Sequence, residues 1–151
     1  MDDKKLTLPP FEYQVRRVNG QIQIFDVIRK QYVILTPEEW VRQHFIHFLA
    51  GHRNYPLPLI AVEQEIDVFG QRKRFDIVCH DRRGLPHLIV ECKSPSVHLS
   101  QSTFDQVFQY NLAIAARYVA ITNGCQHFCG EITEGRKFRL LPSIPYFENP
   151  V

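Results

Sequence analysis

The segment from His87 to Lys93 constrains the fold more than any other part of the chain. Its apolar centre, Leu88-Ile89-Val90, is typical of a buried strand, and Ser94-Pro95 ends that strand. Because side chains alternate along a strand, Glu91 and Lys93 are expected on the same face. Burying an unpaired carboxylate and ammonium costs free energy. We therefore expect this strand end to meet a partner, a metal or a cleft.

Helix and strand signals surround this segment. Thr36, Pro37 and Glu39 stand at the N-cap, N1 and N3 positions of a helix that runs to about Gly51, with Glu39 completing a capping box. A second helix is expected from about Ser100 to Ala116. Strands are expected at about 59–69, 74–80, 87–93 and 118–122. The predicted order is α-β-β-β-α-β, an α/β (α+β) core around a mixed central sheet.

The chain has 151 residues, which favours a single domain over residues 1–151. Residues 1–35 are expected to form an N-terminal arm and a hairpin, whose turn is Asn19-Gly20. Residues 36–124 form the core, and residues 125–151 a C-terminal hairpin and tail. No apolar leader and no stretch long enough to span a bilayer is visible, so we expect a cytoplasmic protein without a membrane partner.

Asp76 is the candidate partner of Glu91. It lies in the preceding strand, and a hairpin of the two strands would bring the carboxylates together. Two close carboxylates repel, and a divalent cation removes that repulsion. Hard oxygen ligands fit Mg²⁺ or Mn²⁺, which bind substrate phosphate and retain waters. Lys93 would then hold or polarise the attacking water, or stabilise developing negative charge.

Asp76 followed by Glu91-Cys92-Lys93 resembles the signature of PD-(D/E)xK nucleases. The resemblance extends over residues 32–124, where the chain looks like the N-terminal nuclease domain of type I restriction enzyme R subunits, and most like its short stand-alone members. It implies a restriction-endonuclease-like fold and a metal-dependent hydrolase of DNA phosphodiesters, acting in restriction or DNA repair. The matching stretches are Thr36-Pro37-Glu38-Glu39, Arg74-Phe75-Asp76-Ile77-Val78, Ile89-Val90-Glu91-Cys92-Lys93-Ser94-Pro95 and Ile121-Thr122-Asn123-Gly124.

The resemblance also implies a carboxylate from the first helix and a Gln-x-x-x-Tyr motif in the second. Glu38 shares the helical spacing of inward-facing apolar residues, so we prefer it over Glu39, which is better placed as a cap. Gln106 and Tyr110 stand at the motif spacing. Gln106 would hydrogen-bond the site or the substrate backbone, and Tyr110 would contact DNA or pack. The chain lacks a Walker A pattern, which excludes an ATP-driven motor within it.

A net charge of only +2 requires that any DNA affinity be local. Lys73 and Arg74 are candidate phosphate contacts, and solvated turn charges are the alternative for them and for Arg82 and Arg83.

Other interpretations remain open. Glu91 and Lys93 would also suit a surface ion pair. The fold would suit a catalytically silent module that binds DNA or another subunit of a restriction or repair complex. The N-terminal hairpin would suit the pairing of two chains into a homodimer. Cys125, His127 and Cys129 share one face of an extended strand, but thiols in a strand are favoured over a zinc site because a second ligand pair is missing.

Overall fold

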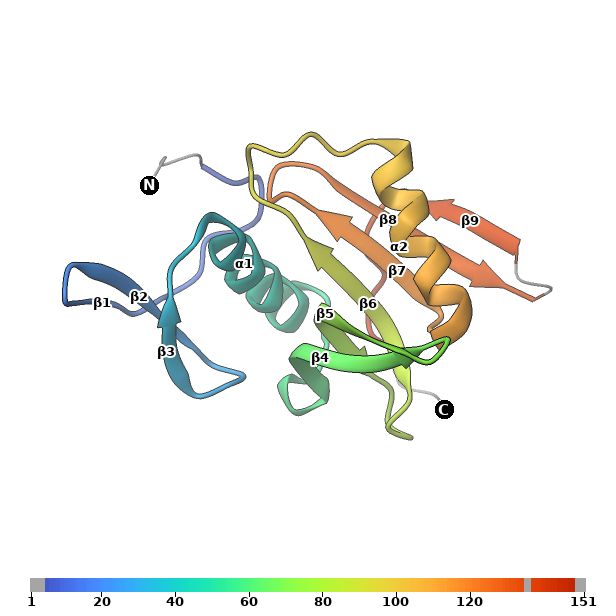
Figure 1. Cartoon of the computed structure of the whole chain (residues 1–151), viewed down its shortest axis with the longest axis horizontal. Helices are drawn as coiled ribbons and strands as arrows, with labels where there is room; N and C mark the ends of the chain where they lie inside the picture. The colour runs from blue at the N-terminus through green and yellow to red at the C-terminus, as the bar shows by residue number, and fades with distance from the viewer. Residues whose placement is uncertain (1–4, 135–136, 149–151) are drawn as a thin grey trace.

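The computed structural model of the chain describes residues 5–134 and 137–148, without the side chains at 110, 112 and 113. A six-stranded mixed sheet forms its centre, with strand order β4-β5-β6-β7-β8-β9 (Figure 1). Only β6 and β7 run parallel, with Val90 opposite Ala120. The strands are β4 (Ile60–Val68), β5 (Gln71–His80), β6 (Pro86–Cys92), β7 (Tyr118–Thr122), β8 (His127–Thr133) and β9 (Lys137–Leu141).

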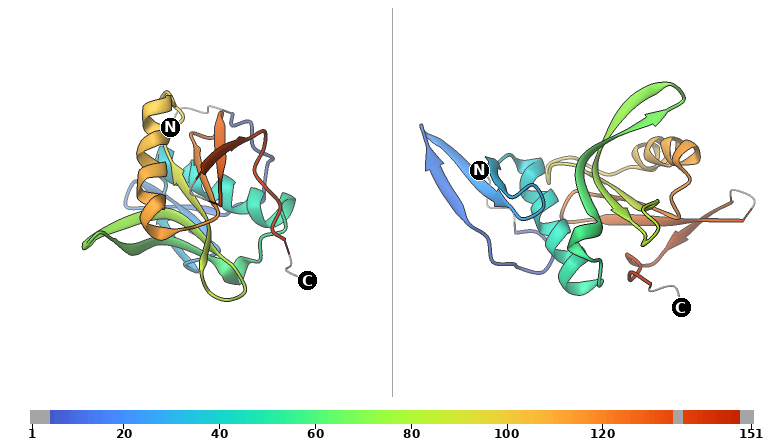
Figure 2. Two further views of the ribbon diagram at one scale, coloured as in Figure 1. Left: turned by 90° about the vertical axis from the view of Figure 1, so that its right-hand side faces the viewer. Right: turned by 90° about the horizontal axis from the view of Figure 1, so that it is seen from below.

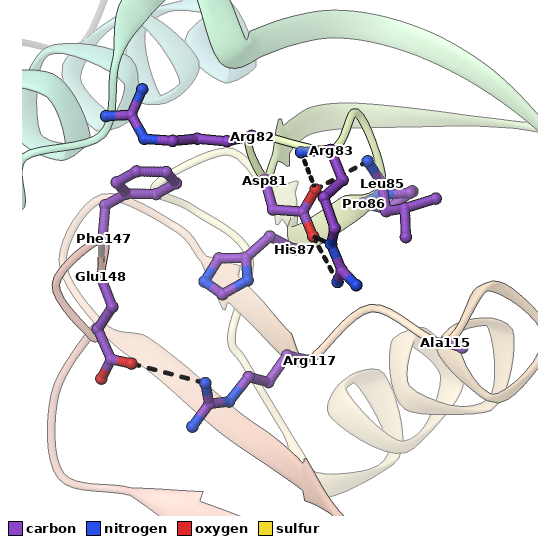
Figure 3. A pocket seen from close by; sticks show the side chains of 10 residues that line it. All are labelled: Asp81, Arg82, Arg83, Leu85, Pro86, His87, Ala115, Arg117, Phe147 and Glu148. Carbon is purple, nitrogen blue, oxygen red and sulfur yellow. Dashed lines mark hydrogen bonds and ion pairs between the residues drawn. The ribbon is translucent and has the colours of Figure 1, made fainter. Parts of the chain in front are cut away.

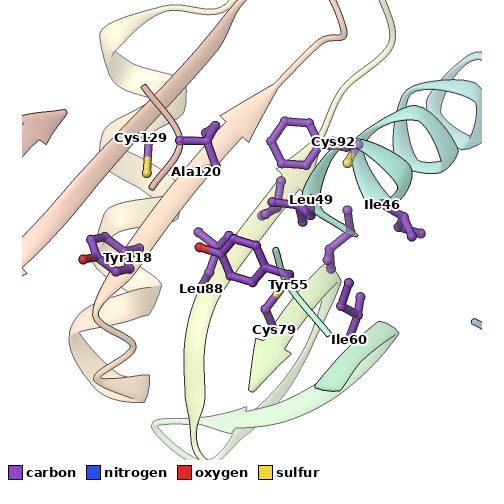
Figure 4. Close-up of a cluster of buried hydrophobic side chains, with 14 of the residues drawn as sticks. Ile46, Leu49, Tyr55, Ile60, Cys79, Leu88, Cys92, Tyr118, Ala120 and Cys129 are labelled. Atoms are coloured by element: carbon purple, nitrogen blue, oxygen red, sulfur yellow. The ribbon is translucent and has the colours of Figure 1, made fainter. Parts of the chain in front are cut away.

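The two long helices cover opposite faces of this sheet (Figure 2). Helix α1 (Pro37–His52) packs on the face that includes Leu88 and Val90, where Phe45 is fully buried. Figure 4 shows part of this cluster, in which Tyr55, just after α1, lies over the sheet. Helix α2 (Gln101–Ile114) packs its apolar residues on the other face, which includes Val119 and Ile121. The predicted α-β-β-β-α-β core is therefore confirmed.

Both helices begin as their sequences predict. The backbone N–H of Glu39 donates to the Thr36 hydroxyl at 3.1 Å, and Pro37 stands in the first turn. Ser100 caps α2 in the same way through the N–H of Thr103. The expected second half of the capping box does not form, because the Glu39 carboxylate bonds to arginine side chains instead. That exchange connects α1 to the candidate site.

The N-terminal segment forms a three-stranded antiparallel sheet where a two-stranded hairpin was expected. It lies beside α1 and apart from the central sheet (Figure 1). The aromatic rings of Phe11 and Tyr13 contact Trp40 of α1, with ring centroids 6.1 Å and 5.1 Å away. The third strand adds to the expected hairpin within residues 1–35. The strands are β1 (Val15–Val18), β2 (Gln21–Asp26) and β3 (Gln31–Ile34).

Two further boundaries differ from the predictions. The basic segment Gln71–Lys73 falls between the strands expected at 59–69 and 74–80, but it belongs to β5, and the turn lies at Phe69 and Gly70, which both have positive φ. The two strands of the C-terminal hairpin extend the central sheet, because β8 pairs with β7. A one-turn 3₁₀ helix, Leu57–Leu59, precedes β4. None of the helices in the described ranges has the length and apolarity needed to cross a membrane.

Candidate metal and catalytic site

The site lies where two neighbouring strands of the central sheet separate. Backbone pairing between β5 and β6 reaches Ile77 and Val90 and goes no further in that direction. Beyond that point, side-chain carboxylates accept the backbone N–H groups in place of carbonyls of the opposite strand. The N–H of Asp76 donates to Glu91 Oε1 at 3.4 Å, and the N–H of Cys92 donates to Asp76 Oδ2 at 2.8 Å. Each carboxylate thus accepts a backbone N–H from the opposite strand, and the two side chains face each other across the gap.

The alternation of β6 orients the Glu-Cys-Lys segment as the sequence predicts. Cys92 is buried in the core beneath α1. Glu91 and Lys93, which alternate with it, are half-buried. The N–H of Lys93 donates to the Thr122 carbonyl of β7 at 2.8 Å, which fixes the backbone next to Glu91. The side chains therefore stand on a strand end held by its neighbour.

The pKa values of both carboxyl groups are raised. For Glu91, burial and the nearby charge of Asp76 raise the pKa to about 7, against the opposing effects of the Asp76 N–H, Lys73 and Lys93. For Asp76, burial raises the pKa, while the Cys92 N–H, Arg42 and Lys93 act in the opposite direction. The pair therefore resists full ionisation near neutral pH unless positive charge is added. A divalent cation or a proton supplies that charge.

The donor set fits a magnesium-type ion better than a structural zinc. Within the described residues no group of three or more His, Cys, Asp or Glu side chains could hold a metal. Mg²⁺ is commonly held by one or two carboxylates, with waters and substrate phosphate as its other ligands. Asp76 and Glu91 provide such a pair at a half-buried position that retains access to solvent, since the Asp76 side chain is 29% exposed.

The cysteine and histidine group after β7 has structural roles. Cys129, on β8, is buried in the hydrophobic core. The two ring nitrogens of His127 lie within hydrogen-bonding distance of hydroxyls, Nδ1 at 2.6 Å from Thr122 and Nε2 at 3.3 Å from Thr7. These contacts tie the N-terminal arm to the turn after β7.

The helix carboxylate nearest the pair is Glu39. Glu38, the residue preferred from helical spacing, is exposed, whereas the side chain of Glu39 is 5% exposed. Glu39 accepts two hydrogen bonds from Arg42, at 2.8 Å and 3.2 Å, and Arg42 Nη1 reaches Asp76 Oδ1 at 3.4 Å. The preference for Glu38 is therefore wrong about orientation: Glu38 faces solvent, and the Glu39 carboxylate, instead of capping the helix, faces inward.

Two arginines that sequence reasoning missed complete this connection. Arg42 stands three residues after Glu39, a spacing that places both on one helical face and was a usable signal. Arg29, from the turn after β2, donates to Glu39 at 2.6 Å and also bonds to the fully buried Asp26. No local pattern indicated this long-range contact. Ion pairs thus run from the N-terminal sheet through α1 to Asp76.

The remaining predicted residues differ in their distance from the pair. Lys73 lies near enough for its charge to lower the pKa of Glu91. Arg74 is exposed and paired with Glu65 at 3.4 Å. Gln106 is exposed on α2, and no hydrogen bond joins its side chain to another residue in the described ranges. The side chain of Tyr110 lies outside the described residues.

Comparison with known proteins places the chain in a family. Among curated proteins, none matches. A family model described as type I restriction enzyme R protein N terminus matches residues 37–145, which include α1, the split between β5 and β6, and α2. Because this match spans most of the chain, the resemblance predicted from the sequence is confirmed. The chain belongs to the family of type I restriction enzyme R protein N-terminal domains.

Proposed function

We propose that the protein is a Mg²⁺- or Mn²⁺-dependent nuclease that hydrolyses DNA phosphodiester bonds. The observation that carries this proposal is the facing pair Asp76 and Glu91, at a strand split where the pKa of Glu91 is raised to about 7. Two carboxylates that cannot both ionise easily form a place where a divalent cation is stabilised. The family, which is the N-terminal region of a restriction enzyme, adds support for a nuclease-like module.

The roles of the side chains follow from their charges. Asp76 and Glu91 would hold the metal, which when bound offsets phosphate charge and acidifies a bound water. Lys93, whose charge acts on both carboxylates, would stabilise negative charge on the phosphate or hold the water. Arg42 acts on Asp76 directly, and Glu39 positions Arg42. Lys73 is the basic residue best placed to meet a phosphate near the pair.

Roles for three other residues remain proposals. Gln106 of α2 and Tyr110 of the same motif would contact the substrate once DNA is bound. Arg74 would release Glu65 and pair with a phosphate, an exchange that costs little because exposed ion pairs are weak. DNA is the proposed partner, together with other subunits of a restriction or repair system, and the cytoplasm is the proposed location.

A cleavage assay tests the nuclease. Supercoiled plasmid and single-stranded DNA are incubated with the protein and Mg²⁺ or Mn²⁺, with EDTA as the metal-free arm. Wild type should cleave only with metal, and Lys93→Ala should abolish cleavage. Lys30→Ala, which removes an exposed lysine from the N-terminal sheet, is the matched control and should cleave like wild type. Absence of cleavage by wild type on every substrate and metal would refute the catalytic proposal.

One observation favours a second candidate, a catalytically silent module that binds DNA or a partner protein. Arg42 already places a fixed positive charge 3.4 Å from Asp76. This charge stabilises the Asp76 carboxylate without a metal, and a protein that only binds a partner needs no further cation there. Calorimetric titration with Mn²⁺ separates the two candidates, because only the nuclease requires metal binding at Asp76 and Glu91.

A further inference from the structure

A pocket of mixed polar and apolar lining lies at the other end of β5 and β6. It has a volume of about 430 Å³ and is formed by the turn between these strands, the start of β7 and the C-terminal tail (Figure 3). His87, in its wall, precedes Glu91 by four residues on β6, a separation of about 13 Å along an extended strand. The pocket is therefore distinct from the carboxylate pair.

Three arginines line this pocket. Arg82 and Arg83 come from the turn between β5 and β6, and Arg117 precedes β7. Asp81 and Glu148 also line the pocket, so guanidinium groups outnumber carboxylates there. Arg83 pairs with Asp81 at 2.9 Å, a partly exposed pair that a bound anion can rearrange. Arg117 is held through Nε by the mostly buried Glu131 at 3.1 Å, while its Nη1 meets the exposed Glu148 at 3.6 Å, so this outer nitrogen is the one that an anion can take over.

The centre of the pocket holds a histidine with an unused hydrogen-bonding atom. Nε2 of His87 is buried and has no hydrogen-bond partner among the described residues. The ring lies between two aromatic side chains, with its centroid 5.2 Å from that of Tyr118 and 6.0 Å from that of Phe147. Burial first, and then the charge of Arg117, lowers the pKa of His87, so its ring is neutral. A buried nitrogen without a partner is costly, and a ligand oxygen placed beside it removes that cost.

The walls suit a ligand with both a charged group and a flat ring. Guanidinium groups that approach from different walls suit a tetrahedral oxyanion, whereas a planar carboxylate is satisfied by one guanidinium fork. The Arg82 guanidinium lies 5.6 Å from the centre of the Phe147 ring, which forms a cationic and aromatic wall for a flat group. The volume falls within the range of small-molecule sites and exceeds the needs of a single inorganic anion.

We propose that this pocket binds a nucleoside monophosphate, with the phosphate held by Arg117 and His87 and the base against Phe147 and Arg82. Because Nε2 of His87 is covered by neighbouring rings, binding shifts Phe147 and the tail segment that carries it. The same chemistry is offered by a free nucleotide and by the 5′-phosphorylated end of a DNA strand. Neither requires the metal site, so this inference does not depend on the proposed nuclease activity.

Titration with deoxyadenosine 5′-monophosphate tests the proposal. The full chain is kept in EDTA, and binding is followed by calorimetry and by ¹H–¹⁵N spectra of the histidine rings. The nucleotide should bind and shift the His87 ring signals. Arg117→Gln and His87→Phe should each weaken binding about tenfold, the effect of losing one hydrogen bond to a charged group. Arg83→Gln is a further variant, at a side chain that is 79% exposed, so it should leave folding intact and weaken binding less.

Arg16→Gln is the matched control, because Arg16 is an exposed arginine of the distant N-terminal sheet with a hydrogen bond to Gln23. It should leave binding unchanged. Deoxyadenosine and benzoate test the need for the phosphate. Binding of either one as tight as that of the nucleotide overturns the proposal, as does the absence of any His87 shift at millimolar nucleotide. Competition by a 5′-phosphorylated oligonucleotide, but not by its 5′-hydroxyl form, would assign the pocket to strand ends. Without such competition, it is assigned to free nucleotides.

Discussion

Asp76 and Glu91 are linked by two hydrogen bonds between backbone and side chain: the N–H of Asp76 donates to the Glu91 carboxylate, and the Asp76 carboxylate accepts the N–H of Cys92. This arrangement replaces the ladder between β5 and β6 at the point where the strands part. It holds two carboxylates close together even though they repel each other. The negative charge of this pair should attract a divalent cation.

Removing either carboxylate should weaken metal binding. Asp76→Asn and Glu91→Gln keep the shape of each side chain but leave only one charged ligand for a cation. We expect Mn²⁺ affinity to fall by at least about tenfold, measured by calorimetric titration. Glu65→Gln is the control, because Glu65 is a carboxylate of β4 already paired with Arg72 and Arg74. If all three variants bound Mn²⁺ with equal affinity, the proposal that Asp76 and Glu91 bind the metal would be refuted.

Glu39 should matter far more to stability than its neighbour. Glu39→Gln removes the closer and more buried of the two carboxylates that Arg29 and Arg42 share, leaving them the partly exposed Glu63, and both arginines are mostly buried. Breaking such a pair costs about 3–5 kcal/mol of unfolding free energy. Glu38→Gln, at an exposed position one residue earlier, should change it by less than about 0.5 kcal/mol. Urea unfolding followed by circular dichroism measures both, and similar losses would contradict the buried network.

Asp26 should make stability depend on acid. Burial raises its pKa, but bonds from Arg29 and from the N–H groups of Ile28 and Arg29 outweigh burial and hold the pKa below the ordinary aspartate value of 3.8. A depressed native pKa contributes stability above the unfolded pKa, and this contribution is lost as the pH falls through the native value. Unfolding free energy should therefore drop below about pH 4.

Asp26→Asn tests this dependence. The variant should be less stable at pH 7, by on the order of 2 kcal/mol, and should show a shallower loss in acid. Urea unfolding from pH 7 to pH 2.5 measures the difference. Glu12→Gln, at an exposed residue before the first strand, should follow the wild-type curve. An Asp26→Asn curve parallel to wild type would show that this carboxylate does not drive the acid response.

Two glycines should respond to alanine in opposite directions. Gly124 has a φ of +87°, and a Cβ atom there would stand 2.7 Å from Leu6 Cδ2. Gly124→Ala should lower the melting temperature, with a cost of about 1–2 kcal/mol. Gly51 lies within α1 with nothing within 4 Å of an added Cβ, so Gly51→Ala should stabilise by about 0.5–1 kcal/mol. Thermal unfolding distinguishes the signs.

Features of the fold that depend on short stretches of sequence were predictable. The cap at Thr36 and the alternation that turns Glu91 away from Cys92 depend only on nearby residues, and both are present. The resemblance drawn from local motifs agrees with the family model, which matches residues 37–145. The roles of Asp76, Glu91 and Lys93 in metal binding and catalysis remain predictions.

Features that depend on distant partners were not predictable. Helical spacing ranks Glu38 and Glu39 by pattern, but burial of Glu39 is decided by Arg29, which approaches from a separate sheet. Likewise, Gln71–Lys73 is polar enough to resemble a turn. It is a strand because charged side chains of β5 pair with residues of β4 such as Glu65. Pairing across the sheet overrides local polarity there.

The contact between Arg29 and Glu39 also bears on how this domain is delimited. The family model begins at residue 37, so its boundary falls between the two partners of this ion pair. A fragment cut at that boundary would keep Glu39 and Arg42 but lose one of the two cations that neutralise Glu39. The N-terminal sheet therefore contributes charge that the rest of the domain needs. A fragment of residues 37–145 alone would leave the Glu39 carboxylate incompletely neutralised next to Arg42, which contacts Asp76.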